Sequence, residues 1–306
     1  MTNPPHIPVL LDDVLEVFAR IDSGIIIDCT LGFGGHSHAL LENNPNICII
    51  GIDKDAQARE FAQNRLQKFG DRFVCVSGGF GEKIGEILDT YGERVKGVLA
   101  DIGVSSLQLD SPERGFGFGS DTLDMRMDKQ SSLNAQVVIN HYSAYELQRI
   151  FRDYGEIREY KKMATLIATQ RDKKPFESAK ELSEFLQRHF KNPRIHPATL
   201  AFQAIRIEVN DELGELERLL KMAGNLRGAV FAVISFHSLE DRMVKNAFKE
   251  WGKSCICDTS LYKCECGSNH ARGVSLTKKP KIASPDEINQ NPRARSAKLR
   301  AFAFKD

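Results

Sequence analysis

The sequence predicts an α/β fold in which helices cover a mostly parallel sheet and a helical domain is inserted between two strands. Short apolar runs that end in aspartate alternate with amphipathic stretches of helical period. A glycine-rich turn directly follows the first run, which is typical of nucleotide-binding α/β sheets. The fourth and fifth runs are more than 120 residues apart, and one crossover helix needs far less, so the gap must contain an insertion.

The first strand is expected at 25–28, where three isoleucines lead into Asp28, and a glycine turn and a helix follow it. Glycine lets the backbone approach a ligand where a Cβ would collide. A dinucleotide site requires G-x-G-x-x-G, and Ser37 stands where the third glycine belongs. The arrangement Asp28-x-x-x-Gly32-x-Gly34 instead resembles the first motif of S-adenosylmethionine-dependent methyltransferases, since a carboxylate suits a ligand with an ammonium and a sulfonium. A glycine turn that binds nothing is the alternative.

The remaining elements are predicted from apolar runs or alternation for strands and from helical periodicity for helices. Apolar runs predict buried strands at 47–53, 73–77, 95–101 and 228–235, and alternation predicts a closing strand at 297–304. Helices are expected at 55–69, 211–224 and 238–251. Within the gap, the capping boxes Ser143-x-x-Glu146 and Ser178-x-x-Glu181 begin two helices, with an apolar stripe for a third between them. We therefore assign residues 1–130 and 205–306 to the sheet domain and residues 131–204 to the helical insertion.

Acidic residues end three of the expected strands, at Asp28, Asp53 and Asp101. Ligands of open parallel sheets bind at the carboxyl edge, so we expect these acids to share one site. Asp53 follows Asp28 by 25 residues, where a ribose-binding acid sits in such folds and accepts from both hydroxyls. Phe80, after the third strand, is a candidate to cover an adenine face, with a place in the core as the alternative.

The net charge of +1 hides an uneven distribution along the chain. Residues 158–206 and residues 270–306 each carry a net charge of +6, which leaves the rest of the chain acidic. Two basic segments on an acidic body suggest a polyanionic partner, and a solvated charged surface is an equally good interpretation of charge alone.

Composition favours a cytoplasmic protein. The sequence shows no signal-peptide pattern, and no apolar run approaches the ~20 residues of a membrane span. Seven cysteines, an odd number, argue against a secreted disulfide framework. Four of them, in Cys255-x-Cys257 and Cys264-x-Cys266, could hold a zinc ion, but the usual steps are C-x-x-C. We favour reduced cysteines in a surface loop and assign no metal.

Motifs along nearly the whole chain together resemble the 16S ribosomal RNA (cytosine-N4)-methyltransferase family, small subunit methyltransferase H. They are His6-Ile-Pro-Val-Leu10, Asp28-Cys-Thr-Leu-Gly-Phe-Gly-Gly-His-Ser37, Gly51-Ile-Asp-Lys-Asp55, Ala100-Asp-Ile-Gly-Val-Ser-Ser-Leu-Gln108, Leu123-Asp-Met-Arg-Met-Asp128, His196-Pro-Ala-Thr199, Phe202-Gln-Ala-Ile-Arg-Ile207, Ile234-Ser-Phe-His-Ser-Leu-Glu-Asp-Arg242 and Asn291-Pro-Arg-Ala-Arg-Ser-Ala-Lys-Leu-Arg300. The chain departs from the family pattern at Leu200 and Ala201 and in a shorter loop at 114–123, which concerns substrate contacts rather than the cofactor site.

The resemblance implies a Rossmann-like class I S-adenosylmethionine-dependent methyltransferase fold with an inserted, substrate-recognising helical domain. It implies methyl transfer to the N4 amine of a decoding-region cytosine. The implied partner is 16S rRNA within the small ribosomal subunit, with no membrane, and with monomer and homodimer both left open. The implied contacts to the cofactor, S-adenosylmethionine, are Gly34, Gly35, His36, Asp53, Phe80, Asp101 and Gln108.

Asp101 is our candidate catalytic residue. In amino-methyltransferases an acceptor after the fourth strand holds the target N–H, and Asp101-Ile-Gly-Val104 occupies that position without the usual prolines and aromatic residue. His237 and Asp124 are weaker candidates, and a structural role is the favoured interpretation of His237. Three other functions compete with this interpretation. Ser37 disfavours a nicotinamide dehydrogenase, and a non-catalytic RNA-binding module would not need acids at three strand ends. An amino-methyltransferase acting on DNA or another RNA differs only in its substrate.

Overall fold

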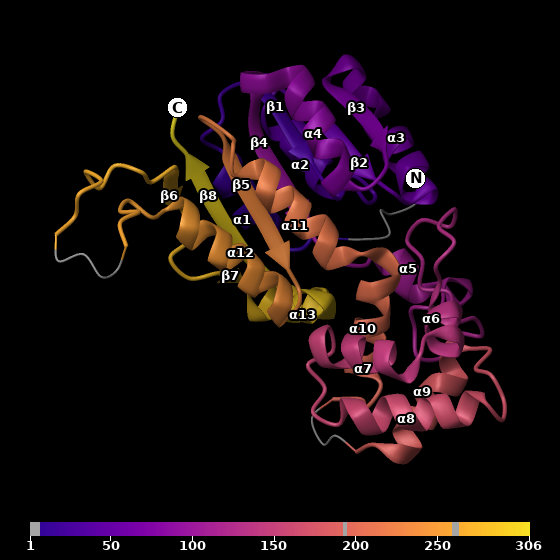
Figure 1. The fold of residues 1–306 in the computed structure, drawn as a ribbon. Coiled ribbons are helices and arrows are strands. Elements are labelled where there is room, and N and C mark those ends of the chain that lie inside the picture. Colours follow the sequence, from indigo (N-terminus) through magenta and orange to yellow (C-terminus); the bar gives the residue numbers. More distant parts are fainter. Residues whose placement is uncertain (1–6, 192–194, 259–262) are drawn as a thin grey trace. The chain divides into compact units, whose positions relative to one another are not determined.

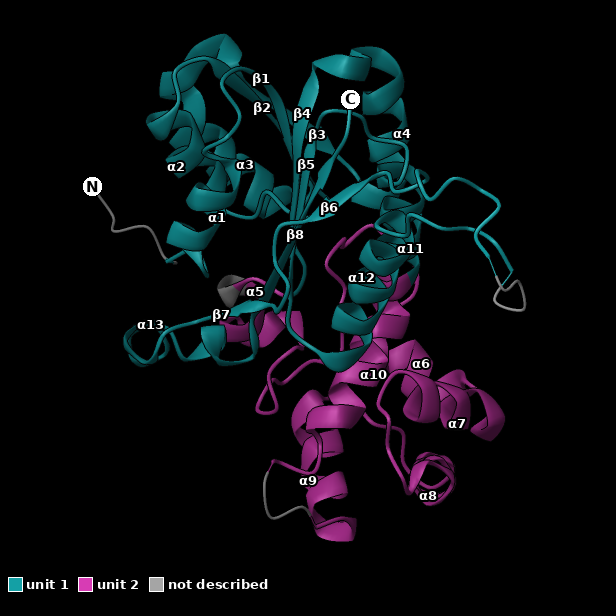
Figure 2. Ribbon diagram, turned by 90° about the vertical axis from the view of Figure 1, so that its left-hand side faces the viewer, with its two compact units in different colours: residues 1–103, 214–306 teal, residues 104–213 magenta. Residues whose placement is uncertain are grey.

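The computed structural model describes residues 7–191, 195–258 and 263–306, and it divides into two compact units (Figure 2). Unit 1 comprises residues 1–103 and 214–306, and unit 2 comprises residues 104–213. Each unit has its own hydrophobic core. His6, the first residue of the quoted motifs, lies outside the described residues.

Unit 1 is built on an eight-stranded sheet of order β3-β2-β1-β4-β5-β8-β6, with β7 paired to β8 (Figure 1). The strands are β1 (Gly24–Asp28), β2 (Ile47–Asp53), β3 (Phe73–Ser77), β4 (Val95–Asp101), β5 (Val230–Ser235), β6 (Gly273–Ser275), β7 (Lys281–Ile282) and β8 (Lys298–Phe304). β1 to β5 are parallel, and β8 runs antiparallel to β5. The predicted α/β fold with a mostly parallel sheet is confirmed, and its chain order reverses between β1 and β4, where such sheets bind ligands.

Helices cover both faces of this sheet, which Figure 2 shows nearly edge-on. Ile26 of β1 packs in a core with one helix layer, whereas Ile25 and Ile27 pack in a second core with the other. The first layer is α1 (Leu11–Phe18), α2 (Gly35–Asn43) and α3 (Ala56–Leu66), and the second is α4 (Phe80–Tyr91), α11 (Glu212–Ala223) and α12 (Ser238–Trp251). Because both faces are buried, the central strands appear in the sequence as continuous apolar runs.

Unit 2 is helical and larger than the insertion expected at 131–204. Its helices are α5 (Ser106–Asp110), α6 (Ala135–His141), α7 (Ala144–Asp153), α8 (Tyr160–Arg171), α9 (Ala179–His189) and α10 (Thr199–Asn210). The Ser143 capping box is formed at the start of α7, and Ser178 caps α9. Phe116 and Leu123 enter the same core as Ile150 and Ile205, so the compact unit extends from residue 104 to residue 213.

The C-terminal part of unit 1 contains the short helix α13 (Pro285–Gln290) and a long connection between α12 and β6. In this connection, residues 252–258 and 263–272 form no helix or strand, and they carry four of the cysteines. Among the residues that the structure describes, no helix is long and apolar enough to span a bilayer.

Candidate active site at the carboxyl edge of the sheet

The glycine turn after β1 is shaped mainly by its neighbours in the protein. Gly32 and Gly34 have φ values of 51° and 69°, in the left-handed region that favours glycine. A Cβ on Gly34 would lie 2.9 Å from Leu66 Cδ1, and one on Gly35 would lie 2.5 Å from Pro8 Cγ. A Cβ on Gly32 would meet only the Thr30 carbonyl oxygen, at 3.8 Å. Close packing therefore explains Gly34 and Gly35, and space for a ligand remains beside Gly32.

Asp28 is a buried brace of this turn, with 1% of its surface exposed. Its Oδ2 accepts from the Ser37 hydroxyl at 2.6 Å, and its Oδ1 accepts from the Thr30 N–H at 3.2 Å. Burial raises the pKa of Asp28, and the Ser37 hydrogen bond opposes that rise. Its burial and these two contacts give Asp28 a role in holding the turn, and the interpretation that its charge faces a cationic ligand stays a prediction. The Ser37 contact explains why a serine replaces the third glycine of a dinucleotide motif.

Asp53 connects the end of β2 to the glycine turn. Its Oδ2 accepts from the Gly32 N–H at 2.8 Å, and its Oδ1 accepts from the Asp55 N–H at 2.8 Å. Burial raises the pKa of Asp53 to about 6, although both amide hydrogen bonds lower it. Each carboxylate oxygen has further acceptor capacity after one such bond. Asp53 can therefore accept from two vicinal hydroxyls while it holds the turn.

Asp101, at the end of β4, has a buried oxygen that lacks a partner. Its N–H donates to Thr30 Oγ1 at 2.6 Å, and its Oδ2 lies 3.8 Å from His36 Nδ1. Its Oδ1 has no hydrogen-bond partner among the described residues. Burial raises the pKa of Asp101 to about 6, and His36 opposes the rise. Because a buried carboxylate oxygen without a donor is costly, this atom indicates a place for a ligand's donor group.

His36 is oriented by the backbone. Its Nε2 lies 2.9 Å from the Val9 carbonyl oxygen, which can only accept, so Nε2 carries the hydrogen. Its Nδ1 is then the nitrogen that faces Asp101.

Phe80 begins α4 and is 8% exposed, with its ring in the core that also contains Ile84 and Ile87. The N-terminus of α4 is capped by Glu215, whose Oε2 accepts from the Gly81 N–H at 2.6 Å. Glu215 is buried, and a Cβ on Gly79 would collide with its carboxylate. Sequence reasoning missed Glu215, because its partner lies 134 residues away and its own place in a helix is unremarkable.

The other predicted residues have local partners. Gln108 belongs to unit 2, where its Oε1 accepts from the Ser105 N–H at 3.0 Å. Asp124, also in unit 2, binds Arg126 through both carboxylate oxygens, at 2.7 and 2.9 Å, which lowers its pKa against the effect of burial. His237 precedes α12 as its N-cap residue, and its Nε2 lies 2.9 Å from Glu240 Oε1. The Arg126 contact supports a structural role for Asp124. Neither ring nitrogen of His237 has a hydrogen-bond partner among the described residues, so the structural role of His237 stays a prediction.

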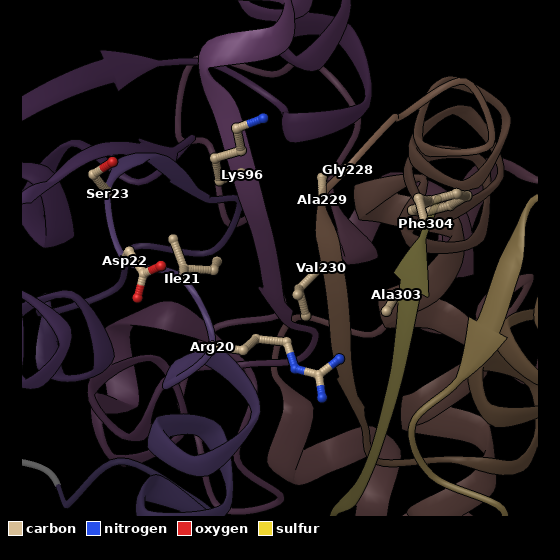
Figure 3. A pocket seen from close by; sticks show the side chains of 10 residues that line it. All are labelled: Arg20, Ile21, Asp22, Ser23, Lys96, Gly228, Ala229, Val230, Ala303 and Phe304. Atoms are coloured by element: carbon tan, nitrogen blue, oxygen red, sulfur yellow. The ribbon is translucent and has the colours of Figure 1, made fainter. Parts of the chain in front are cut away.

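Two cavities among the described residues lie at the opposite edge of the sheet. One of about 380 Å³ is lined by residues at the amino ends of β1, β4 and β5 and at the carboxyl end of β8 (Figure 3). Arg20, Asp22 and Lys96 supply its charged side chains. Open parallel sheets bind ligands at the carboxyl ends of their strands, so we do not assign the cofactor to this cavity.

We expect Asp101→Asn to stabilise the unliganded protein at neutral pH. The folded-state pKa of Asp101 is raised from 3.8 to about 6, so the folded state loses stability as pH rises between these values. Asparagine removes this effect, which amounts to about 1–3 kcal/mol at pH 7. In thermal unfolding, the stability of the variant relative to the wild type should increase between pH 4 and pH 7. A variant destabilised equally at both values would contradict the raised pKa.

The chain matches the MraW methylase family over residues 3–305. It is 60% identical over 300 residues to "Ribosomal RNA small subunit methyltransferase H" of Helicobacter pylori, covering 98% of this chain and 97% of that protein. It is 57% identical over 302 residues to the protein of the same name from Aliarcobacter butzleri, covering 98% and 99%. A solved rRNA methylase from Streptococcus thermophilus aligns over 100% of this chain and 99% of that chain, with a TM-score of 0.37 and 11% identity, too distant to bear on function. On a family match that spans nearly its full length, the chain belongs to the MraW methylase family.

Proposed function

We propose that this enzyme transfers the methyl group of S-adenosylmethionine to the N4 amine of a specific cytosine in the decoding region of 16S rRNA. Membership of a methylase family, and relatives named as small subunit rRNA methyltransferases, support the reaction and the class of substrate. The structural observation that carries the proposal is the pair of carboxylates at Asp53 and Asp101. They end β2 and β4, the strands on either side of β1 and its glycine turn.

The residues at this edge fit S-adenosylmethionine. Asp53 has acceptor capacity for the two ribose hydroxyls, and the unpartnered oxygen of Asp101 suits the methionine ammonium. We assign the turn residues Gly34, Gly35 and His36 to the edge of the same site and Phe80 to the adenine. When bound, S-adenosylmethionine supplies a methyl group that its sulfonium already makes strongly electrophilic.

The protein's task is chiefly to position and polarise the amine. The N4 lone pair of cytosine is delocalised into the ring, so an acceptor on N4–H helps to direct it toward the methyl group. We assign this acceptor to Asp101, whose carboxylate is mostly ionised at neutral pH with a pKa of about 6. The cytosine must leave its stack to reach the site.

Unit 2 is assigned to recognition of the RNA. Its segment 158–206 carries the net charge of +6, and Lys161, Lys162, Lys173 and Lys174 are exposed. Exposed lysines at high density favour a polyanion over a small ligand. The proposed partner is the assembled small ribosomal subunit, which places the enzyme in the cytoplasm.

The test offers labelled S-adenosylmethionine with duplex DNA, free 16S rRNA and small ribosomal subunits in parallel. We expect the label on N4-methylcytosine in the RNA of the subunit, at one site, and none on DNA. Asp101→Asn should reduce the rate at least tenfold, because a neutral amide oxygen is a weaker acceptor than a carboxylate. Subunits already methylated at this position serve as the control acceptor. Label on DNA, or on another base, would overturn the proposal.

A further inference from the structure

We propose that Cys255, Cys257, Cys264 and Cys266 bind a structural Zn²⁺ ion. Their four Sγ atoms lie within 4.8 Å of one another, although the two pairs are separated in the chain. Three of the separations are 3.6 Å (Cys255–Cys264), 3.6 Å (Cys264–Cys266) and 3.7 Å (Cys255–Cys266). The inference is independent of the proposed function, because it concerns the connection between α12 and β6.

These separations match the geometry of a zinc tetrathiolate. A regular tetrahedron with Zn–S bonds of about 2.3 Å has S···S edges of about 3.8 Å. A disulfide would instead bring two sulfurs to about 2.05 Å, and all four of these cysteines are free. The four thiols are therefore arranged around a common centre rather than joined in pairs.

Two backbone amides donate hydrogen bonds to the cysteine sulfurs. The N–H of Ile256, between the first two cysteines, donates to Cys266 Sγ at 3.4 Å. The N–H of Glu265, between the second two, donates to Cys257 Sγ at 3.2 Å. Each C-x-C step thus donates its central amide to a sulfur of the other step. A neutral thiol is a weak acceptor, so this reciprocal pair of bonds favours anionic, metal-bound sulfur.

An ion bound by the four cysteines would stabilise the connection between α12 and β6. Its base is closed by the His270 N–H donating to the Ser254 carbonyl at 2.9 Å and the Arg272 N–H to the Trp251 carbonyl at 2.7 Å. Beyond this base the described residues form no helix or strand, and they are mostly exposed. Short C-x-C steps joined by Zn²⁺ would hold such a segment without a hydrophobic core. A site with four protein sulfurs leaves no open position, so it is structural and not catalytic.

The choice of metal follows from the ligand set. Thiolates are soft ligands, and an all-sulfur tetrahedral site in a protein selects zinc or iron. Zinc needs no redox chemistry to remain bound, which suits a site this exposed to solvent. Metal analysis of the full chain can separate the two directly.

The experiment measures metal in full-length, tag-free protein purified without chelator. We expect about one Zn²⁺ per chain by mass spectrometry, released in step with modification of four thiols by a mercurial reagent. Cys264→Ser with Cys266→Ser should lose at least nine-tenths of that zinc. The matched control is Cys48→Ser with Cys75→Ser, which removes two cysteines of the sheet and should retain it.

A second measurement does not depend on the variants folding well. Removing zinc from the wild-type protein with a chelator should loosen the connection and speed tryptic cleavage after Lys253, Lys263 and Arg272, and added Zn²⁺ should slow it again. Binding of S-adenosylmethionine should be unchanged in the same samples, which shows that the sheet is still folded. Four freely reactive thiols in protein with no zinc would overturn the site, and stoichiometric iron would overturn the choice of metal.

Discussion

Asp53→Ala should weaken binding of S-adenosylmethionine by one to three orders of magnitude while the sheet remains folded. The change removes a charged acceptor for two ribose hydroxyls. This loss costs about 2–4 kcal/mol of binding free energy, which raises the dissociation constant roughly 30- to 700-fold. It also frees the Gly32 and Asp55 amides that the carboxylate holds, so the turn itself should loosen. Isothermal titration calorimetry gives the affinity, and thermal unfolding reports on the fold.

Two further variants sharpen this experiment. Asp53→Asn keeps an acceptor oxygen of the same shape but loses the charge, so its affinity should fall between those of the wild type and the alanine variant. Asp89→Ala removes an exposed carboxylate from α4 and should leave the affinity unchanged. Near-normal binding in the folded Asp53→Ala variant would remove Asp53 from the cofactor site.

Reversing four charges on unit 2 should weaken binding to small ribosomal subunits at least tenfold and flatten its salt dependence. The change is Lys161, Lys162, Lys173 and Lys174 to Glu, all of them exposed. Each phosphate contact contributes a log–log salt slope of about −0.7 on single strands, so lost contacts appear in the slope as well as in the affinity. Lys162 and Lys174 also pair with Glu159 and Glu181 on the surface. Such exposed pairs contribute at most about 1 kcal/mol, so the fold should survive.

The control for this experiment reverses four exposed lysines of unit 1: Lys68, Lys245, Lys249 and Lys305. It changes the net charge equally, so it separates a local binding surface from a general effect of charge. Affinity for S-adenosylmethionine should stay the same in both variants. If both variants lost subunit binding equally, the result would argue against RNA recognition by unit 2. Arg194, also in the basic segment, lies outside the described residues.

The sheet was predictable because burial on both faces gives its strands a plain signature. Runs such as Ile47–Asp53 and Val230–Ser235 have apolar residues on both faces and turn signals at their ends. β6 and β7 were missed, since strands of three and two residues carry no period. Unit 2 extends beyond the expected insertion at 131–204, because Phe116 and Leu123 join its core from loops without a repeating pattern.

The positions of the three strand-end acids were predictable, but the contacts of each carboxylate were not. Chain spacing placed Asp28, Asp53 and Asp101 at one edge of the sheet, and the structure confirms that each ends its strand. Spacing could not show which carboxylate faces inward, and Asp28 proved to be engaged by Ser37 and Thr30. The contact of Glu215 was not predicted, because only the folded chain brings Glu215 to the start of α4.

β5 acquires its two neighbours from distant parts of the chain, which makes assembly of the sheet a late event. β4 precedes it by more than 120 residues, and β8, which pairs along its other edge, is synthesised last of all the described strands. Contacts so far apart in sequence form slowly. Until translation reaches β8, a nascent chain presents Val230, Phe231 and Ile234 on a strand with an unpaired edge, where another chain could add. Chaperone demand and aggregation during expression should therefore be concentrated in the interval between synthesis of β5 and release of the chain.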